Sequence, residues 1–252
     1  MGVMLMAGER LSTRKFQQVN NWLLRVHDWL LPASCVLCSR AGVGGRDLCS
    51  GCAAELPYMK SSCVRCAIPL PQLGTCGRCQ QSAPSFDSAY ATFSYQPPIA
   101  QLIQGLKFNG RLYNARLLGE LMVENLSSQR VELPDVLVPV PLHAARLRER
   151  GFNQALELAR PIAKNLAVPL VAGCCRRVRS TSAQTGLDAK ARRRNLRDAF
   201  ELVRHVNGTH VAIVDDVMTT GSTVEVLAST LKQAGVKRVD VWLCARAALR
   251  GQ

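Results

Sequence analysis

The chain has 252 residues, of which 48% are apolar, and a formal net charge of +14. This length allows one full domain with a small additional module, and the apolar fraction is that of a chain that folds around a core. A disordered or fibrous protein is therefore excluded. The positive charge is densest between residues 146 and 197, where 13 basic residues stand against 3 acidic ones. Such a segment attracts phosphate groups, either those of a small ligand or those of a nucleic acid.

Residues 1–31 contain two apolar WLL triplets that are separated by charged residues. No uninterrupted apolar run reaches the length of a secretory signal or a membrane span, so we expect no membrane span and a cytoplasmic protein. The spacing of Trp22, Val26 and Trp29 predicts an amphipathic helix. We expect residues 1–31 to be an N-terminal extension that serves as a lid or docking helix, with contact to a partner or a membrane as the weaker alternative.

Eight of the eleven cysteines form four Cys-x-x-Cys pairs, which are separated by 10, 10 and 9 residues. Each pair can present two thiolates from one tight turn, and two pairs complete a tetrahedral Zn²⁺ site. The sequence therefore predicts a double zinc ribbon over residues 32–82 that holds two structural zinc ions. The predicted zinc ligands are Cys35, Cys38, Cys49, Cys52, Cys63, Cys66, Cys76 and Cys79.

Other uses of the four cysteine pairs are weaker. A reducing compartment disfavours a disulfide framework, and four repeats disfavour a redox dithiol, so an iron–sulfur centre is the main competitor. Sequential pairing, first with second and third with fourth, is the simplest arrangement, but the spacing also allows an interleaved one. With four thiolates on each ion, no coordination position stays open for chemistry. The ribbons therefore either stabilise the fold or bind nucleic acid or protein.

From residue 86 onward, short apolar runs alternate with amphipathic segments. This alternation predicts an α/β domain with a doubly wound parallel sheet over residues 86–252. We expect buried strands at 136–140, 211–214 and 238–245, and helices at 153–166 and 222–235. Pro161 is expected to kink or shorten the first helix, and Gly235 is expected to end the second. Ligands of such sheets bind beyond the carboxyl ends of the strands.

The stretch VAIVDDVMTTGST, residues 211–223, lies at such a strand end. Residues 219–223 are small and mostly hydroxylated, and they connect the strand to the following helix. The backbone N–H groups and hydroxyls of this turn suit a phosphate monoester, and Gly221 lets the backbone approach it closely. Asp215 and Asp216 suit vicinal hydroxyls, a metal ion, or both. A ligand with a phosphate at one end and a diol a sugar's width away is a ribose 5-phosphate.

The same stretch resembles the phosphoribosyl-pyrophosphate (PRPP) signature of type I phosphoribosyltransferases, in which two acids follow an apolar strand and precede a Thr/Gly/Ser loop. This resemblance implies a type I phosphoribosyltransferase-like fold, Mg²⁺ bound with PRPP, and transfer of a pentosyl group. Asp215 and Asp216 are the candidate catalytic residues, and the motif carries no universal catalytic base. The resemblance assigns to PRPP the residues Asp215, Asp216, Val217, Met218, Thr219, Thr220, Gly221, Ser222 and Thr223.

Two further segments, VPVPLHAARLRERGFNQA (138–155) and TSAQTGLDAKARRRNLRDAF (181–200), are similar to the ComF family of competence and DNA-utilisation proteins, also called GntX-like. In that family, zinc ribbons precede a phosphoribosyltransferase domain. The similarity implies a mobile loop at 179–195 that closes over PRPP. It also implies a pyrophosphate-binding loop, which with its flanking residues comprises Pro141, Leu142, His143, Arg146, Arg150, Gly151, Asn153 and Gln154.

Some residues carry less information. Lys107 and Phe108, in GLKFNGR, resemble a motif of the family, but the sequence suggests no mechanism for them. His143 is interpreted as an ordinary loop histidine, with a contact to the site as the weaker alternative, and His210 belongs to no recognisable constellation.

Three functions stay open at this stage. The chain is an active phosphoribosyltransferase with a nucleobase or amine acceptor, a DNA-handling protein, or a PRPP-sensing regulator without turnover. Our working hypothesis places it in the uptake or utilisation of DNA. On this hypothesis the zinc ribbons and the basic surface contact single-stranded DNA, while the α/β domain binds Mg²⁺ and PRPP.

Overall fold

The computed structural model describes residues 33–178 and 199–248. The chain divides into two compact units, Met1–Glu55 and Leu56–Gln252. The boundary falls between the second and the third Cys-x-x-Cys pair, so each unit contains one half of the predicted ribbon segment. The predicted N-terminal helix at 1–31 and the predicted mobile loop at 179–195 lie outside the described residues.

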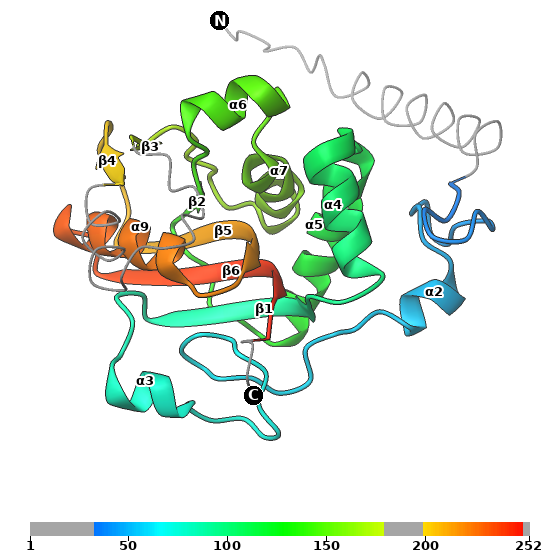
Figure 1. Cartoon of the computed structure of the whole chain (residues 1–252), viewed down its shortest axis with the longest axis horizontal. Helices are drawn as coiled ribbons and strands as arrows, with labels where there is room; N and C mark the ends of the chain where they lie inside the picture. The colour runs from blue at the N-terminus through cyan, green and yellow to red at the C-terminus, as the bar shows by residue number, and fades with distance from the viewer. Residues whose placement is uncertain (1–32, 179–198, 249–252) are drawn as a thin grey trace, which may run out of the picture. The chain divides into compact units, whose positions relative to one another are not determined.

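Short helices occur in the cysteine-rich segment, and the sheet with its longer helices follows that segment (Figure 1). The first unit contains α2 (Ser50–Ala54). The elements of the second unit are α3 (Gly77–Gln81), β1 (Ser88–Ser94), α4 (Ile99–Asn109), α5 (Leu112–Ser128), β2 (Val136–Pro139), α6 (Ala144–Arg150), α7 (Gln154–Leu166), β3 (Cys175–Arg177), β4 (Phe200–Leu202), β5 (His210–Met218), α9 (Ser222–Gln233) and β6 (Arg238–Arg246).

The central sheet has four parallel strands in the order β1-β6-β5-β2. Its two central strands, β5 and β6, are buried along almost their whole length. Their near-continuous apolar sequences are typical of parallel strands that are covered on both faces. The predicted strands correspond to β2, β5 and β6, so the expectation of a parallel α/β sheet is confirmed. β3 and β4 form a separate antiparallel pair.

Helices cover both faces of the sheet. α4, α5 and α7 pack together on one face, which the view in Figure 1 shows above the strands. On the opposite face, Leu227 and Leu231 of α9 share a core cluster with Val211 and Ile213 of β5. Successive residues of a strand point to opposite faces, and this alternation decides which helices each residue near the end of β5 meets.

Helix α7 passes through Pro161 and continues to Leu166, so Pro161 does not shorten this helix, which was the second of the two effects expected of it. The proline ring packs against α5 at Gly119, where a Cβ atom would lie only 2.4 Å from Cγ of Pro161. The absence of a side chain at Gly119 therefore lets the two helices approach each other closely. Gly235, with φ of 99°, follows the end of α9 as expected.

The third and fourth cysteine pairs fold together with the sheet. The N–H of Met59 donates to the carbonyl of Thr92, and the N–H of Ser94 donates to the carbonyl of Pro57, both at 2.9 Å. The segment before the second cysteine cluster thus pairs with β1 at the sheet edge. Ala67, between two cysteine ligands, is fully buried in the core cluster that contains α9. In residues 33–178 and 199–248, no helix is long and apolar enough to cross a membrane.

Candidate functional site

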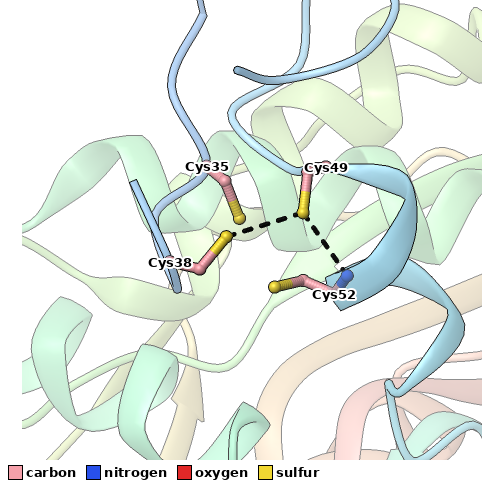
Figure 2. A group of neighbouring side chains, drawn as sticks. All are labelled: Cys35, Cys38, Cys49 and Cys52. Atoms are coloured by element: carbon pink, nitrogen blue, oxygen red, sulfur yellow. Dashed lines mark hydrogen bonds between the residues drawn. The ribbon is translucent and has the colours of Figure 1, made fainter. Parts of the chain in front are cut away.

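The side chains of Cys35, Cys38, Cys49 and Cys52 converge on a common centre (Figure 2). Their sulfur atoms all lie within 4.8 Å of one another, and Sγ of Cys38 lies 3.6 Å from Sγ of Cys49. A tetrahedral zinc ion with Zn–S bonds of about 2.3 Å places its sulfur ligands about 3.8 Å apart. This cluster therefore fits a structural zinc ion.

A second cluster contains the other four ligand candidates, Cys63, Cys66, Cys76 and Cys79, with their sulfur atoms also within 4.8 Å of one another. Sγ of Cys66 lies 3.7 Å from Sγ of Cys76, which again suits tetrahedral zinc. The first Cys-x-x-Cys pair thus clusters with the second, and the third with the fourth. This is the sequential arrangement, and it excludes the interleaved one. Both clusters fit closed sites with structural zinc.

Backbone N–H groups point at thiol sulfurs in both clusters. The N–H of Cys52 donates to Sγ of Cys49 at 3.5 Å, and the N–H of Cys76 donates to Sγ of Cys63 at 3.3 Å. Burial raises the pKa of the Cys63 thiol, but hydrogen bonds from the backbone outweigh burial and lower this pKa to about 7. These donors stabilise the thiolate, which is the form that binds zinc.

The loop between β5 and α9 surrounds a hollow at the carboxyl end of the sheet. The hollow has a volume of about 230 Å³ with its open mouth, and Asp215 and residues 217–224 line it. Gly221, at the N-cap of α9, has φ of 84°, which glycine adopts without strain. The hydroxyls of Thr220 and Ser222 lie 2.8 Å apart. A helix start with adjacent hydroxyls offers the donors that an anion such as phosphate needs.

The two aspartates lie within β5, which runs two residues beyond them, and they point to opposite faces of the sheet. Asp215 adjoins the hollow beside α9. Asp216 instead contacts Lys107 of α4 and Gln154 of α7. Of the two aspartates, therefore, only Asp215 lines the hollow.

Asp215 is a buried carboxyl group. Burial raises its pKa well above the ordinary value, the neighbouring Asp216 raises it further, and the Lys107 ammonium opposes this rise. Oδ1 of Asp215 accepts the N–H of Asp216 at 2.9 Å. An ionised carboxylate in such surroundings is stabilised by a ligand that donates hydroxyl hydrogen bonds or carries positive charge.

Asp216 connects α4 with α6 and α7. Its carboxylate forms an ion pair with the Lys107 ammonium and accepts a hydrogen bond from Nε2 of Gln154 at 3.2 Å. The amide oxygen of Gln154 in turn accepts a hydrogen bond from Nη1 of Arg150. The Arg150 guanidinium lies 5.7 Å from the ring centroid of Phe108, which is largely exposed. The GLKFNGR motif, for which sequence analysis found no mechanism, thus supplies the counter-ion of the second aspartate.

The predicted pyrophosphate loop, Pro141–His143, begins one residue after β2 ends at Pro139, and it is half-buried. Nδ1 of His143 accepts the N–H of Ala145 at 3.3 Å and caps α6, consistent with its interpretation as a loop histidine. The adjacent carbonyl of Val140 accepts a hydrogen bond from Nδ2 of Asn153 at 3.0 Å. These contacts tie the loop to both flanking helices.

Two arginines, Arg150 and Arg177, lie within electrostatic range of the acidic pair, and Arg146 lies within range of both arginines. Burial lowers the pKa of Arg177, the charge of Arg146 lowers it further, and Asp215 opposes both. Burial likewise lowers the pKa of Arg150, against the charge of Asp216. Arg146 and Arg150 were predicted to flank a pyrophosphate. Arg177, the last residue of the short strand β3, lies within electrostatic range of Arg146. Arg179, the first residue of the predicted mobile loop, lies outside the described residues.

His210 lies at the other end of β5. Its Nε2 lies 2.9 Å from Oδ2 of the fully buried Asp240, which also accepts Nη2 of Arg238 at 2.9 Å. The interpretation that His210 belongs to no constellation is therefore wrong, because the pairing of β5 with β6 brings these distant residues together. The group lies at the amino end of the strands and stabilises the sheet rather than the hollow.

Comparison with known families agrees with this architecture. The double zinc ribbon domain family matches residues 26–80, and the phosphoribosyl transferase domain family matches residues 152–249. The fold, the cysteine clusters and these matches define the class as a phosphoribosyltransferase-like protein with a double zinc ribbon.

Several relatives cover most of the chain. The DNA utilization protein YhgH of Salmonella typhimurium is 38% identical over 223 residues, which cover 86% of this chain and 98% of the relative. Competence protein F of Haemophilus influenzae is 35% identical over 225 residues, covering 84% and 96%. Competence protein ComFC of Bacillus subtilis is 24% identical over 199 residues, covering 75% and 79%. The chain belongs to the ComF family of competence and DNA-utilisation proteins.

Proposed function

We propose that this protein binds PRPP together with Mg²⁺ at the carboxyl end of β5. The observation that carries the proposal is the hollow lined by Asp215 and the hydroxylated loop at the start of α9. The loop takes the 5-phosphate through N–H groups and hydroxyls, and Asp215 takes the ribose hydroxyls. The match to the phosphoribosyl transferase domain family supports this assignment.

The arginines around the acidic pair suit the pyrophosphate of PRPP. Arg146, Arg150 and Arg177 supply positive charge where a leaving pyrophosphate would accumulate negative charge. Mg²⁺, when bound, would neutralise part of the same charge, and the carboxylate of Asp215 is an oxygen ligand of the kind it prefers. Asp216 holds Arg150 in place through Gln154. We infer pentosyl transfer to a nitrogenous acceptor, with Asp215 facing the positive charge that develops on the ribose.

Calorimetric titration of the whole protein with PRPP, with and without Mg²⁺, tests the binding proposal. We expect a dissociation constant between about 1 μM and 1 mM, which is the usual range for enzyme substrates, and tighter binding with Mg²⁺. Pyrophosphate release measured against a panel of nucleobases, amines and DNA then separates a transferase from a sensor. Absence of PRPP binding under both conditions would reject the proposal.

We further propose that the material on which the protein acts derives from DNA. Its relatives are named for DNA utilization and competence, and the basic residues between 146 and 197 suit a phosphate backbone. We expect binding of single-stranded DNA that weakens with salt, with a slope of about −0.7 in log–log form for each phosphate neutralised. Filter retention of a labelled oligonucleotide across a salt series measures this slope. No retention at low salt would remove single-stranded DNA as a partner.

A further inference from the structure

Arg246, the last residue of β6, is buried, with 2% of its surface exposed. Its Nε donates to the carbonyl oxygen of Cys66 at 3.0 Å, inside the second cysteine cluster. Its Nη1 donates to the carbonyl oxygens of Met218 at 2.9 Å and Thr219 at 2.6 Å, where β5 passes into residues 219–223, which we call the phosphate loop. One buried guanidinium group thus joins the backbone of a zinc-ligand residue to the start of the loop.

Arg78 makes a second connection between the same two regions. It lies in α3, and its Nη1 donates to the carbonyl oxygen of Thr220 at 3.2 Å. Because Cys76 is the N-cap of α3 and Cys79 lies within the helix, the cluster fixes the place of the Arg78 backbone. Two arginines therefore bind three consecutive carbonyl groups of the loop, those of residues 218–220.

These contacts determine the direction of the loop's peptide groups. In a trans peptide unit the C=O group and the following N–H group point in opposite directions. Arginines that hold the carbonyls of residues 218–220 therefore turn the N–H groups of residues 219–221 away from the cysteine cluster. A peptide with the reverse orientation would present its carbonyl oxygen to the ligand, and an oxygen with partial negative charge repels a phosphate.

We propose that Arg246 and Arg78 are positioning residues that orient the amides of the phosphate loop, and that the second Cys₄ cluster holds both arginines in place. This inference rests on the proposed function, since it assigns a phosphate to the loop. Arginine suits the task because its planar guanidinium sends several N–H groups in fixed directions, which a lysine ammonium does not. The second cluster then supports ligand affinity as well as folding.

Arg78→Ala tests the proposal with ribose 5-phosphate as the calorimetric probe. We expect its dissociation constant to rise about 5-fold, the usual effect of losing one hydrogen bond, with zinc content and the midpoint of thermal unfolding unchanged. Arg78→Lys should recover part of the affinity, and Arg246→Lys should weaken binding by about 10-fold or more. The matched control is Arg65→Ala, because exposed Arg65 of the same cluster donates to the carbonyl of Asp87, outside the loop, at 3.0 Å. This control should keep the wild-type affinity.

Hydrogen exchange of residues 218–223 in the ligand-free protein gives a second readout, which does not depend on ligand binding. We expect faster exchange in Arg78→Ala and wild-type exchange in Arg65→Ala. Equal losses of affinity in the two variants would overturn the proposal, because they would indicate a general charge effect, and so would unchanged loop exchange in Arg78→Ala. A wild-type protein that binds neither ribose 5-phosphate nor PRPP would reject the proposed function instead, and the exchange data would still decide whether Arg78 orders the loop.

Discussion

Asp215→Asn is expected to weaken PRPP binding by about 100-fold while leaving the protein at least as stable as the wild type. The carboxylate that adjoins the hollow is lost, but Oδ1 of the asparagine can still accept the N–H of residue 216. Because burial raises the pKa of Asp215 in the folded state, this group lowers the free energy of unfolding at neutral pH. This destabilisation declines as the pH falls from the raised pKa to the ordinary pKa of an aspartate, below which it is gone, and the asparagine variant should lack it. Titration calorimetry and thermal unfolding at several pH values measure the two effects.

Asp240→Asn is the matched control for Asp215→Asn. Asp240 is a buried aspartate of the neighbouring strand β6, but it lies at the amino end of the sheet with His210 and Arg238. Removing its charge leaves Arg238 paired with the more exposed Glu132, so we expect a loss of about 1–3 kcal/mol of stability with PRPP affinity retained. The double variant Asp215→Asn/Asp216→Asn should abolish PRPP binding without changing zinc content. Wild-type PRPP affinity in either Asp215 variant would refute the site assignment.

Cys63→Ser is expected to remove one zinc ion and to destabilise the α/β unit by about 3 kcal/mol or more. Cys63 is fully buried, and its cluster belongs to the same compact unit as the sheet. Loss of the metal would loosen the chain around Ala67, which packs in the main core, and around the carbonyl of Cys66, which holds Arg246. Metal analysis measures the first effect, and denaturant unfolding followed by tryptophan fluorescence, to which the buried Trp242 of β6 contributes, measures the second.

Cys35→Ser separates this role from a general effect of losing zinc. Cys35 is buried in the first cluster, and that cluster belongs to the other compact unit. We expect this variant also to lose one zinc ion but to leave the unfolding of the α/β unit near that of the wild type. Equal destabilisation by the two serine variants would show that the clusters stabilise the sheet to the same extent, contrary to this expectation.

Short-range patterns predicted much of the molecule. The Cys-x-x-Cys spacing located all eight cysteine ligands, because two thiolates three residues apart meet within one turn. The apolar runs located β2, β5 and β6, because a parallel strand that is buried on both faces needs a continuous apolar sequence. The small residues of 219–223 predicted the loop, since their side chains suit a ligand better than a core.

Long-range contacts were beyond these patterns. The pairing of Lys107 with Asp216 depends on how α4 packs against the sheet, and the motif around Lys107 was the only available signal. The close approach of α5 and α7 depends on Gly119, which lies opposite the ring of Pro161 on another helix. The bond from Arg246 to Cys66 spans 180 residues, and no local spacing predicts such a contact.

The sequence by itself determined which cysteines cluster and which segments form the parallel sheet, and it located the small, hydroxylated loop to which we assign a phosphate. Only the tertiary structure decided how these parts are connected: that Asp215 and Asp216 face different layers, and that the second cysteine cluster belongs to the unit that carries the phosphate loop. The physical reason is that ligand chemistry and backbone periodicity are local properties of the chain. The partner of a buried charge, by contrast, depends on which distant segment packs beside it.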